Sequence, residues 1–226
     1  MRMSKLQIAG LMLAGAVSLA SEAKAERYQV SVGGGASYLP SQSVDSLTDA
    51  TSYARFDLEA GMKLLHVPIL GHTEVGLNWD SGAVSGTSFG RIESDLSLNT
   101  VMALARVRRP VYRWISGFAE LGLGLQWGHL TLHDSDSNSA RSIEDWDKAA
   151  ASSVGAGLDI QLSDSNGPFN VALRTKLSYR AMTPLEFRAT PMSEGSDELL
   201  LSSTSADLGS VNTSGMAFAI GLVGKF

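Results

Sequence analysis

The chain has 226 residues, of which 44% are hydrophobic and 18% charged, with a formal charge of −5 at pH 7 and no cysteine. The charged fraction is below the roughly 25% usual for soluble domains and the hydrophobic content is ordinary, which excludes a disordered chain and a polytopic helical membrane protein. The absence of cysteine excludes a disulfide scaffold, a cysteine metal cluster and a thiol nucleophile. The acidic balance argues against a nucleic-acid-binding protein.

The beginning of the chain has the pattern of a cleaved secretory signal peptide. Arg2 and Lys5 provide a positive start, an apolar run follows, and residues 23–25 (Ala-Lys-Ala) form a small-x-small cleavage site. A membrane anchor is the alternative, but the apolar run is shorter than the roughly 20 residues that span a bilayer as a helix. We therefore expect residues 1–25 to be removed after Sec-type export and residues 26–226 to form one mature domain.

The mature part alternates between apolar and polar residues in eight segments. In the second segment Phe56 and Leu58 alternate with Asp57 and Glu59, a period of two that predicts a β-strand. Each segment is long enough to cross a bilayer, which takes about 9–11 residues in a tilted strand. The eight expected strands are 28–38, 53–64, 72–80, 92–105, 115–127, 154–162, 169–180 and 216–226.

Alternation alone does not decide which face is inside, because a soluble lipocalin-like barrel has the same period. The polar face is rich in glycine and serine, which suits a crowded lumen better than a solvated surface. The apolar face carries aromatic residues near the strand ends, as expected for rings at the two membrane interfaces. These predicted girdle residues are Tyr38, Trp79, Trp127 and Tyr179 toward one rim and Tyr28, Phe169 and Phe226 toward the other.

The lengths of the connections alternate as well. The long ones are 39–52, 81–91, 130–150 and 181–212, and the short ones are 65–71, 106–113 and 163–168. Outer-membrane barrels have short periplasmic turns and longer external loops. The pattern therefore predicts an all-β, eight-stranded, antiparallel up-and-down transmembrane β-barrel, or a barrel of ten strands if segment 181–212 contains a hairpin.

The end of the chain carries the most specific resemblance. Together with the strand pattern, the final segment Gly221–Phe226 is similar to that of the small bacterial outer-membrane barrels, the superfamily that includes the OmpA transmembrane domain, OmpX and OmpW. The resemblance implies a location in the Gram-negative outer membrane, with lipid and lipopolysaccharide as surroundings. It also implies that the barrel-assembly machinery recognises the C-terminal Phe226.

The interior of an eight-stranded barrel is just filled by side chains, so a general porin is excluded. Charged residues of both signs are expected to face this interior, and we interpret them as an ion-pair network that fills it. A narrow channel for small solutes is the alternative. The predicted inward charges are Arg55, Lys63, Arg174, Lys176, Arg180 and Lys225 with Asp57, Glu59, Glu74, Asp80, Glu93, Asp95, Glu120 and Asp159.

The long connections are rich in acidic residues and form the best candidate surface for interactions. They could hold divalent cations that bridge to lipopolysaccharide phosphates, or contact an external ligand or host surface through loops 130–150 and 181–212. No cofactor and no metal site are expected, because the sequence around Asp134 and Asp136 lacks the glycine and the final glutamate of a calcium loop. We therefore expect a structural or surface-interaction role.

An enzyme is the remaining alternative. His133 and Ser135 resemble the His-x-Ser motif of the outer-membrane lipid A deacylases, in which a histidine base activates a serine nucleophile, and Glu144 could orient the histidine. In that family the motif lies on the lipid-facing surface, whereas here it lies in a polar loop. We therefore assign no catalytic residue and treat lipid A deacylation as an alternative function.

Overall fold

The computed structural model describes residues 27–39, 51–68, 71–88, 92–134, 142–163, 169–189 and 206–226. The expected leader, residues 1–25, lies outside the described residues. Within these ranges no helix has the length and apolar character needed to span a membrane. The strands are β1 (Tyr28–Tyr38), β2 (Ser52–Val67), β3 (Gly71–Ser88), β4 (Ile92–Tyr112), β5 (Ile115–Asp134), β6 (Ser142–Gln161), β7 (Asn170–Met182), β8 (Leu185–Ala189), β9 (Ala206–Val211) and β10 (Gly215–Lys225).

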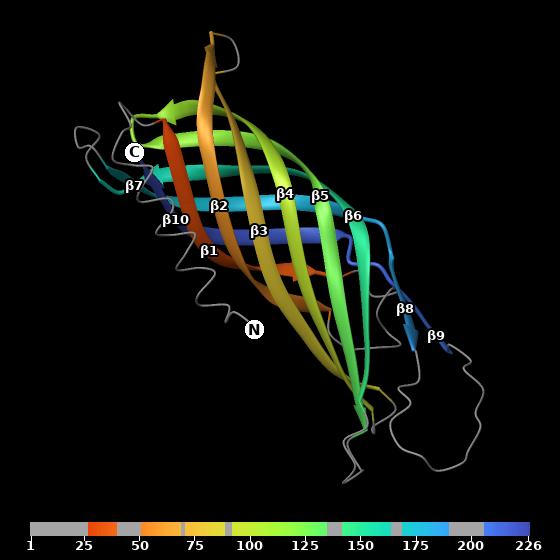
Figure 1. The fold of residues 1–226 in the computed structure, drawn as a ribbon. Coiled ribbons are helices and arrows are strands. Elements are labelled where there is room, and N and C mark those ends of the chain that lie inside the picture. Colours follow the sequence, from red (N-terminus) through yellow and green to blue (C-terminus); the bar gives the residue numbers. More distant parts are fainter. Residues whose placement is uncertain are drawn as a thin grey trace, which may run out of the picture.

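Eight of these strands form a closed barrel in the order β1-β10-β7-β6-β5-β4-β3-β2 (Figure 1). All neighbouring pairs are antiparallel, and the barrel closes where β1 pairs with β10, with Val32 opposite Leu222. The predicted eight-stranded antiparallel barrel is confirmed. Segment 181–212 does contain a hairpin, but β8 and β9 form a separate two-stranded sheet, so the alternative of a ten-stranded barrel is wrong.

The strands on one side of the barrel are longer than expected. β4 has 21 residues, and β3, β5 and β6 have 18 to 20 residues, about twice the length that crosses a bilayer. Much of the segments 81–91 and 130–150, which were expected to be loops, is therefore strand. These extensions and β8–β9 lie at the same end of the barrel, opposite the short turns (Figure 1). Because short turns are periplasmic in outer-membrane barrels, the extended end is the external one.

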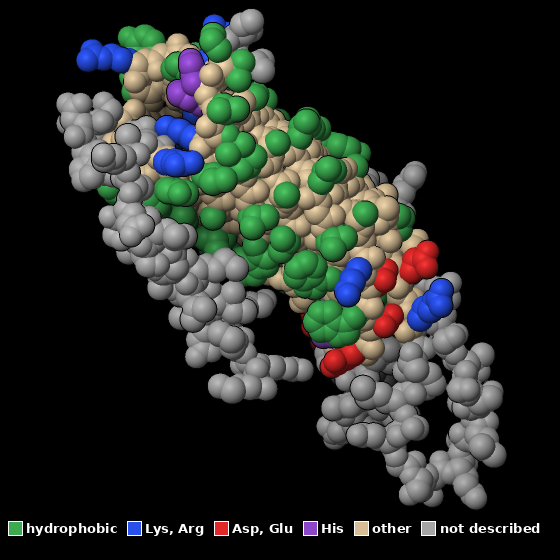
Figure 2. Space-filling model, turned by 45° about the horizontal axis from the view of Figure 1, so that its top comes forward, with side chains coloured by type: hydrophobic (Ala, Val, Ile, Leu, Met, Phe, Trp, Pro, Cys, Tyr) green, Lys and Arg blue, Asp and Glu red, His purple; other side chains and the backbone are tan. Residues whose placement is uncertain are grey.

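The outer face of β4 changes character along the strand. Val101 and Val107 belong to the apolar outward face, whereas Glu93 and Asp95, nearer the external end, are exposed and charged. Trp127 of β5 lies opposite Asn99, where the change occurs. Figure 2 shows the same division, with hydrophobic side chains over the middle of the visible face and charged groups near its ends. The apolar belt therefore ends near Trp127 on the external side.

The inward-facing side chains change in the opposite way, from charged at membrane level to apolar toward the external end. Beyond the belt, the inside of the extended barrel is an apolar core into which β8 inserts Leu185 and Phe187, both fully buried. The outer face of β8 is held by β6, because Asp147 accepts a hydrogen bond from the Glu186 amide at 2.6 Å and Asp145 accepts one from the Arg188 amide at 2.5 Å. The core residues are Leu39, Tyr53, Val84, Leu96, Leu98, Leu130, Ala149, Leu185, Phe187 and Val211.

Candidate functional site

The membrane-level part of the lumen contains a network of buried charges centred on Arg106 of β4. Its guanidinium lies 2.8 Å from both carboxylate oxygens of Glu59 on β2. It also donates to Glu120 Oε2 on β5, at 3.1 Å from Nε and 2.6 Å from Nη2. Lys176 of β7 approaches the other Glu120 oxygen at 3.2 Å. These inward positions on four strands are therefore joined across the barrel.

Arg174 and Arg108 extend the network toward the periplasmic end. Arg174 donates to Asp159 Oδ1 at 2.8 Å and to Glu59 Oε1 at 2.7 Å. Arg108 forms two hydrogen bonds to Glu74, at 2.6 and 3.0 Å, and an ion pair with Asp159. Both guanidiniums also donate to Gln29 Oε1, at 3.1 Å from Arg108 and 3.2 Å from Arg174. Asp159 and Glu74 are thus each held by more than one donor, which compensates for their removal from water.

A second charged group lies closer to the external end. Arg180 of β7 makes a bidentate pair with Asp80 of β3, with distances of 3.0 and 2.7 Å. Asn78 donates to Asp57 at 2.9 Å. Arg55 is buried beside this pair, with Nη1 3.9 Å from Asp80 Oδ2. The second group therefore links β2, β3 and β7.

An aromatic ring sits among the arginines. The guanidinium carbons of Arg106, Arg174 and Arg108 lie 4.6, 5.0 and 5.7 Å from the centre of the Phe118 ring. The electron-rich face of an aromatic ring attracts cations within about 6 Å. Phe118 therefore makes a favourable contact with each of the three cations.

The network leaves little space in the middle of the lumen. The cavity beside Asp57, Arg174 and Lys176 has a volume of about 10 Å³. The one between Glu59, Glu74 and Arg106 has none that a water molecule could enter. A water molecule needs roughly 10–15 Å³. At these two places the side chains leave room for one water molecule at most.

Ten of the fourteen charges predicted for the lumen are buried. They are Arg55, Asp57, Glu59, Glu74, Asp80, Glu120, Asp159, Arg174, Lys176 and Arg180. Glu93 and Asp95 were predicted to face the lumen, and this was wrong because both are exposed. They lie on the extended part of β4, where the outer face meets water and the inward positions belong to Leu96 and Leu98 instead.

Sequence reasoning missed two central residues of the network, Arg106 and Arg108. Both fell in segment 106–113, which was taken for a short turn, whereas β4 continues to Tyr112. The signal was present, since Met102, Leu104, Arg106 and Arg108 continue one alternating face while the small or apolar residues between them face outward. Because the predicted strand ended at residue 105, the prediction did not place these two arginines in the lumen.

The aromatic residues predicted for the two girdles occupy outward positions, near the strand ends except for Trp79 and Trp127, which lie within the extended strands β3 and β5. On the periplasmic side, Phe169 stacks on Phe226 with ring centres 6.0 Å apart, and Tyr28 exchanges backbone hydrogen bonds with Phe226 at 2.9 and 3.0 Å. On the other side, Trp79 and Trp127 are half-buried and Tyr38 and Tyr179 are exposed. Trp114 lies in the turn between β4 and β5.

The residues considered for lipid A deacylation are not assembled by the described part of the chain. Ser135 lies outside the described residues, and the backbone of His133 pairs with Ser142. The Glu144 carboxylate is 3.5 Å from Nε2 of a different histidine, His129. The described residues also include no group of three or more side chains that could hold a metal ion.

With the barrel geometry established, comparison with known proteins decides the family. The model of the outer membrane protein beta-barrel domain family matches residues 9–226. The chain belongs to this family. It is therefore a β-barrel protein of the Gram-negative outer membrane, as the family resemblance implied.

The chain is similar to solved structures of outer-membrane proteins. Neisserial surface protein A has a TM-score of 0.52 and 11% identity, covering 90% of this chain and 99% of that chain. Ail of Yersinia pestis has a TM-score of 0.46 and 14% identity, covering 89% and 98%. The N-terminal barrel of Pseudomonas aeruginosa OprF has a TM-score of 0.37 and 10% identity, covering 90% and 100%. No curated protein matches this chain.

Proposed function

We propose that this outer-membrane barrel has no enzymatic role and serves as a rigid support for a surface that contacts ligands outside the cell. The observation that carries the proposal is the filled interior. Ion pairs occupy the lumen at membrane level, and the apolar core with Leu185 and Phe187 occupies the extended part above it. An interior of this kind supports contact through the outer surface better than transport through the lumen.

The external end of β5 and β6 offers a suitable contact surface. Trp146 is 61% exposed and stacks on His129, with ring centres 4.0 Å apart and an angle of 15° between the planes. Glu144 and Lys148 lie on the same face of β6, two residues to either side. A large aromatic side chain held rigidly among charged groups is typical of residues that dominate binding interfaces.

Several partners belong to this proposal. The apolar belt is surrounded by membrane lipid, and acidic residues at the external end, such as Glu93, Asp95 and Glu144, can hold divalent cations that bridge to lipopolysaccharide phosphates. The ring of Phe226 is the proposed recognition element for the barrel-assembly machinery. The leader of residues 1–25 is the proposed export signal. A host surface is the proposed external partner.

The two alternative functions find less support in the geometry. A narrow channel needs a continuous water path, whereas the cavity beside Asp57 and Arg174 measures about 10 Å³. A deacylase needs a carboxylate beside its histidine base, whereas Glu144 lies beside His129. We therefore retain the surface role.

The proposal is tested by adhesion of bacteria that produce the protein to cultured animal cells. Trp146→Ala removes the exposed aromatic residue at the external end. Trp114→Ala, a 49% exposed tryptophan in a periplasmic turn, is the matched control. We expect adhesion above the level of bacteria without the protein, reduced several-fold by Trp146→Ala and unchanged by Trp114→Ala. Adhesion equal with and without the protein would refute the surface role.

A further inference from the structure

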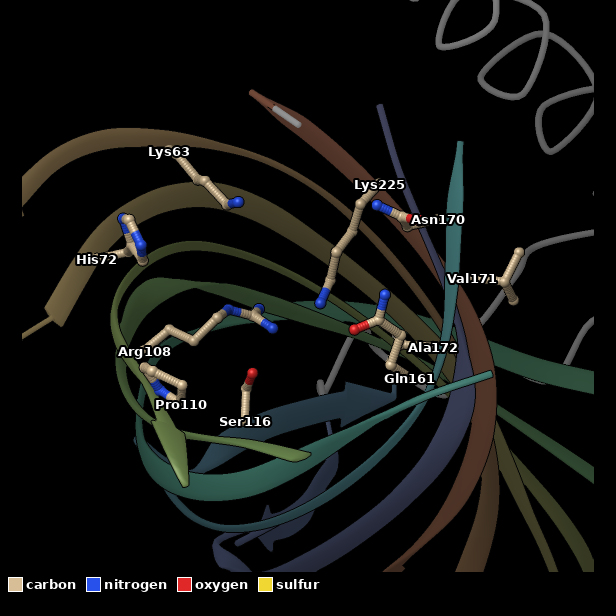
Figure 3. A pocket seen from close by; sticks show the side chains of 10 residues that line it. All are labelled: Lys63, His72, Arg108, Pro110, Ser116, Gln161, Asn170, Val171, Ala172 and Lys225. Atoms are coloured by element: carbon tan, nitrogen blue, oxygen red, sulfur yellow. The ribbon is translucent and has the colours of Figure 1, made fainter. Parts of the chain in front are cut away.

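The periplasmic mouth of the barrel contains a cavity with a volume of about 180 Å³. A water molecule occupies about 30 Å³ in the liquid, so the cavity has room for a group of several heavy atoms. Figure 3 shows side chains from several strands pointing into this space. The lining residues are Lys63, His72, Arg108, Pro110, Ser116, Gln161, Asn170, Val171, Ala172 and Lys225.

The charges around the cavity have one sign. Lys63, Arg108 and Lys225 line it, and none of the described lining residues is acidic. In Figure 3 the three charged groups approach the space from different sides, with the Ser116 hydroxyl and the Gln161 amide nearby. These side chains place N–H and O–H donors around one cavity, which is the composition of a site for an anionic oxygen group.

The carboxylates behind the cavity are already engaged. Asp159 accepts from Arg174 at 2.8 Å, pairs with Arg108, and lies 3.3 Å from Lys225 Nζ. Glu74 accepts two hydrogen bonds from Arg108 and one from Gln29 at 2.8 Å. The positive charge that faces the cavity is therefore backed by carboxylates whose oxygens are shared among several donors.

The balance of charge gives the same sign. Among the described residues, the buried cations of the lumen and the buried carboxylates number six each. Lys63 and Lys225 at the mouth add positive charge to this balanced set. The side chain of Lys225 is only 15% exposed, so solvent screens it less than a surface lysine. An anion entering the mouth would therefore meet a positive potential in a partly desolvated site.

We propose that the periplasmic mouth of the barrel is a binding site for a phosphate group. Lys63, Lys225 and Arg108 provide the charge, and Ser116 and Gln161 provide neutral donors. The phosphate group can come from a free small anion in the periplasm or from a phospholipid headgroup of the inner leaflet. The site lies at the end of the barrel opposite the proposed contact surface and does not depend on it.

The test uses the full mature barrel, refolded in a maltoside detergent that contains no phosphate. Inorganic phosphate is added at constant ionic strength against chloride, and backbone amide signals of Ser116, Gln161 and Ala172 are followed by NMR. A second arm, in phosphate-free buffer, compares nanodiscs of phosphatidylglycerol with nanodiscs of phosphatidylcholine, in which the choline cation compensates the charge of the phosphate. We expect a saturable shift of these amides with inorganic phosphate, or a specific shift with phosphatidylglycerol, and the responding arm identifies the source.

Variants separate the site from general charge effects. Lys225→Gln and Lys63→Gln should each weaken binding at least tenfold. Lys225→Arg keeps the positive charge and should bind as tightly as the unchanged protein. Lys148→Gln removes one positive charge from an exposed position at the external end and should leave binding unchanged. The heat-dependent gel mobility of each variant checks that the barrel is folded. The proposal would be overturned if inorganic phosphate gave no saturable shift and the two kinds of nanodisc gave equal spectra, or if the response fell equally in Lys148→Gln.

Discussion

Replacement of Arg106 by methionine probes the centre of the ion-pair network. Arg106 lies 2.8 Å from both Glu59 oxygens and donates to Glu120 at 3.1 and 2.6 Å. Removing one partner of a buried ion pair usually costs about 3–5 kcal/mol, because a charge remains buried without compensation. Glu59 keeps Arg174 at 2.7 Å and Glu120 keeps Lys176 at 3.2 Å, which places the expected loss at the lower end, about 3 kcal/mol.

The assay is reversible urea unfolding of the barrel refolded in lipid vesicles, followed by tryptophan fluorescence. With a slope of about 1–3 kcal/mol per molar urea, a loss of about 3 kcal/mol lowers the midpoint by about 1–3 M. Arg109→Met on the same strand is the matched control, because Arg109 is exposed and a surface substitution changes stability by about 0.5 kcal/mol or less. Adding Glu120→Gln to Arg106→Met should recover part of the loss. Equal midpoints for Arg106→Met and Arg109→Met would refute the role of the network.

Three further predictions concern the β8–β9 hairpin, the contacts between strands and the enzymatic alternative. Phe187→Ala removes a fully buried ring, costs the docked hairpin about 3–5 kcal/mol and should expose segment 183–214 to protease in intact cells, while the barrel keeps its heat-dependent gel mobility. Gly35→Ala should destabilise the barrel by about 1–3 kcal/mol, because the added Cβ would clash with the backbone oxygen of Phe218. Gly34→Ala is the control and should be tolerated, because its Cβ would lie 3.5 Å from the backbone oxygen of Arg55. Equal urea midpoints for the two variants would contradict this prediction. Mass spectrometry of lipid A should show the same acylation with the protein, without it, and with His133→Ala; a lost acyl chain that depends on His133 would establish the enzyme.

The membrane-level part of the fold could be predicted from the sequence because two solvents act on each strand. Phe56 and Leu58 must face lipid, while Asp57 and Glu59 must find partners inside, so a period of two fixes both the strand and its orientation. The family resemblance of the final strand agrees with this alternation. The ion-pair partners were recognisable as a set for the same reason.

The external half could not be predicted in the same way, because there the polar side chains face outward and the apolar side chains face inward. Glu93 faces water on the outside while Leu96 and Leu98 pack inside, so the polarity pattern of a membrane strand no longer applies. The hairpin that fills this core depends on contacts distant in sequence, such as Phe187 with Leu98 in one cluster. Local alternation carries no information about such contacts. The ends of the long strands and the packing of the β8–β9 hairpin against this core could therefore not be predicted.

The pairing inside the lumen was also beyond sequence reasoning. Arg174 meets Glu59 across 115 positions of the chain, and only the closed barrel with its register brings the two together. The alternation indicates that both side chains face the interior, but it does not indicate how far along the barrel each one lies. The cationic cavity at the periplasmic mouth depends on the same register, because Lys63, Arg108 and Lys225 come from β2, β4 and β10.

The filled interior is the central claim, and electrical recording tests it most directly. The refolded protein, checked for its heat-dependent gel mobility, is inserted into a planar lipid bilayer and the current is measured in molar potassium chloride. With Arg106, Arg174 and Phe118 filling the lumen at membrane level and Phe187 filling the core above, we predict no conductance above that of the bare bilayer. A stable conductance that increases in proportion to the number of inserted molecules would show a continuous water path and contradict the account.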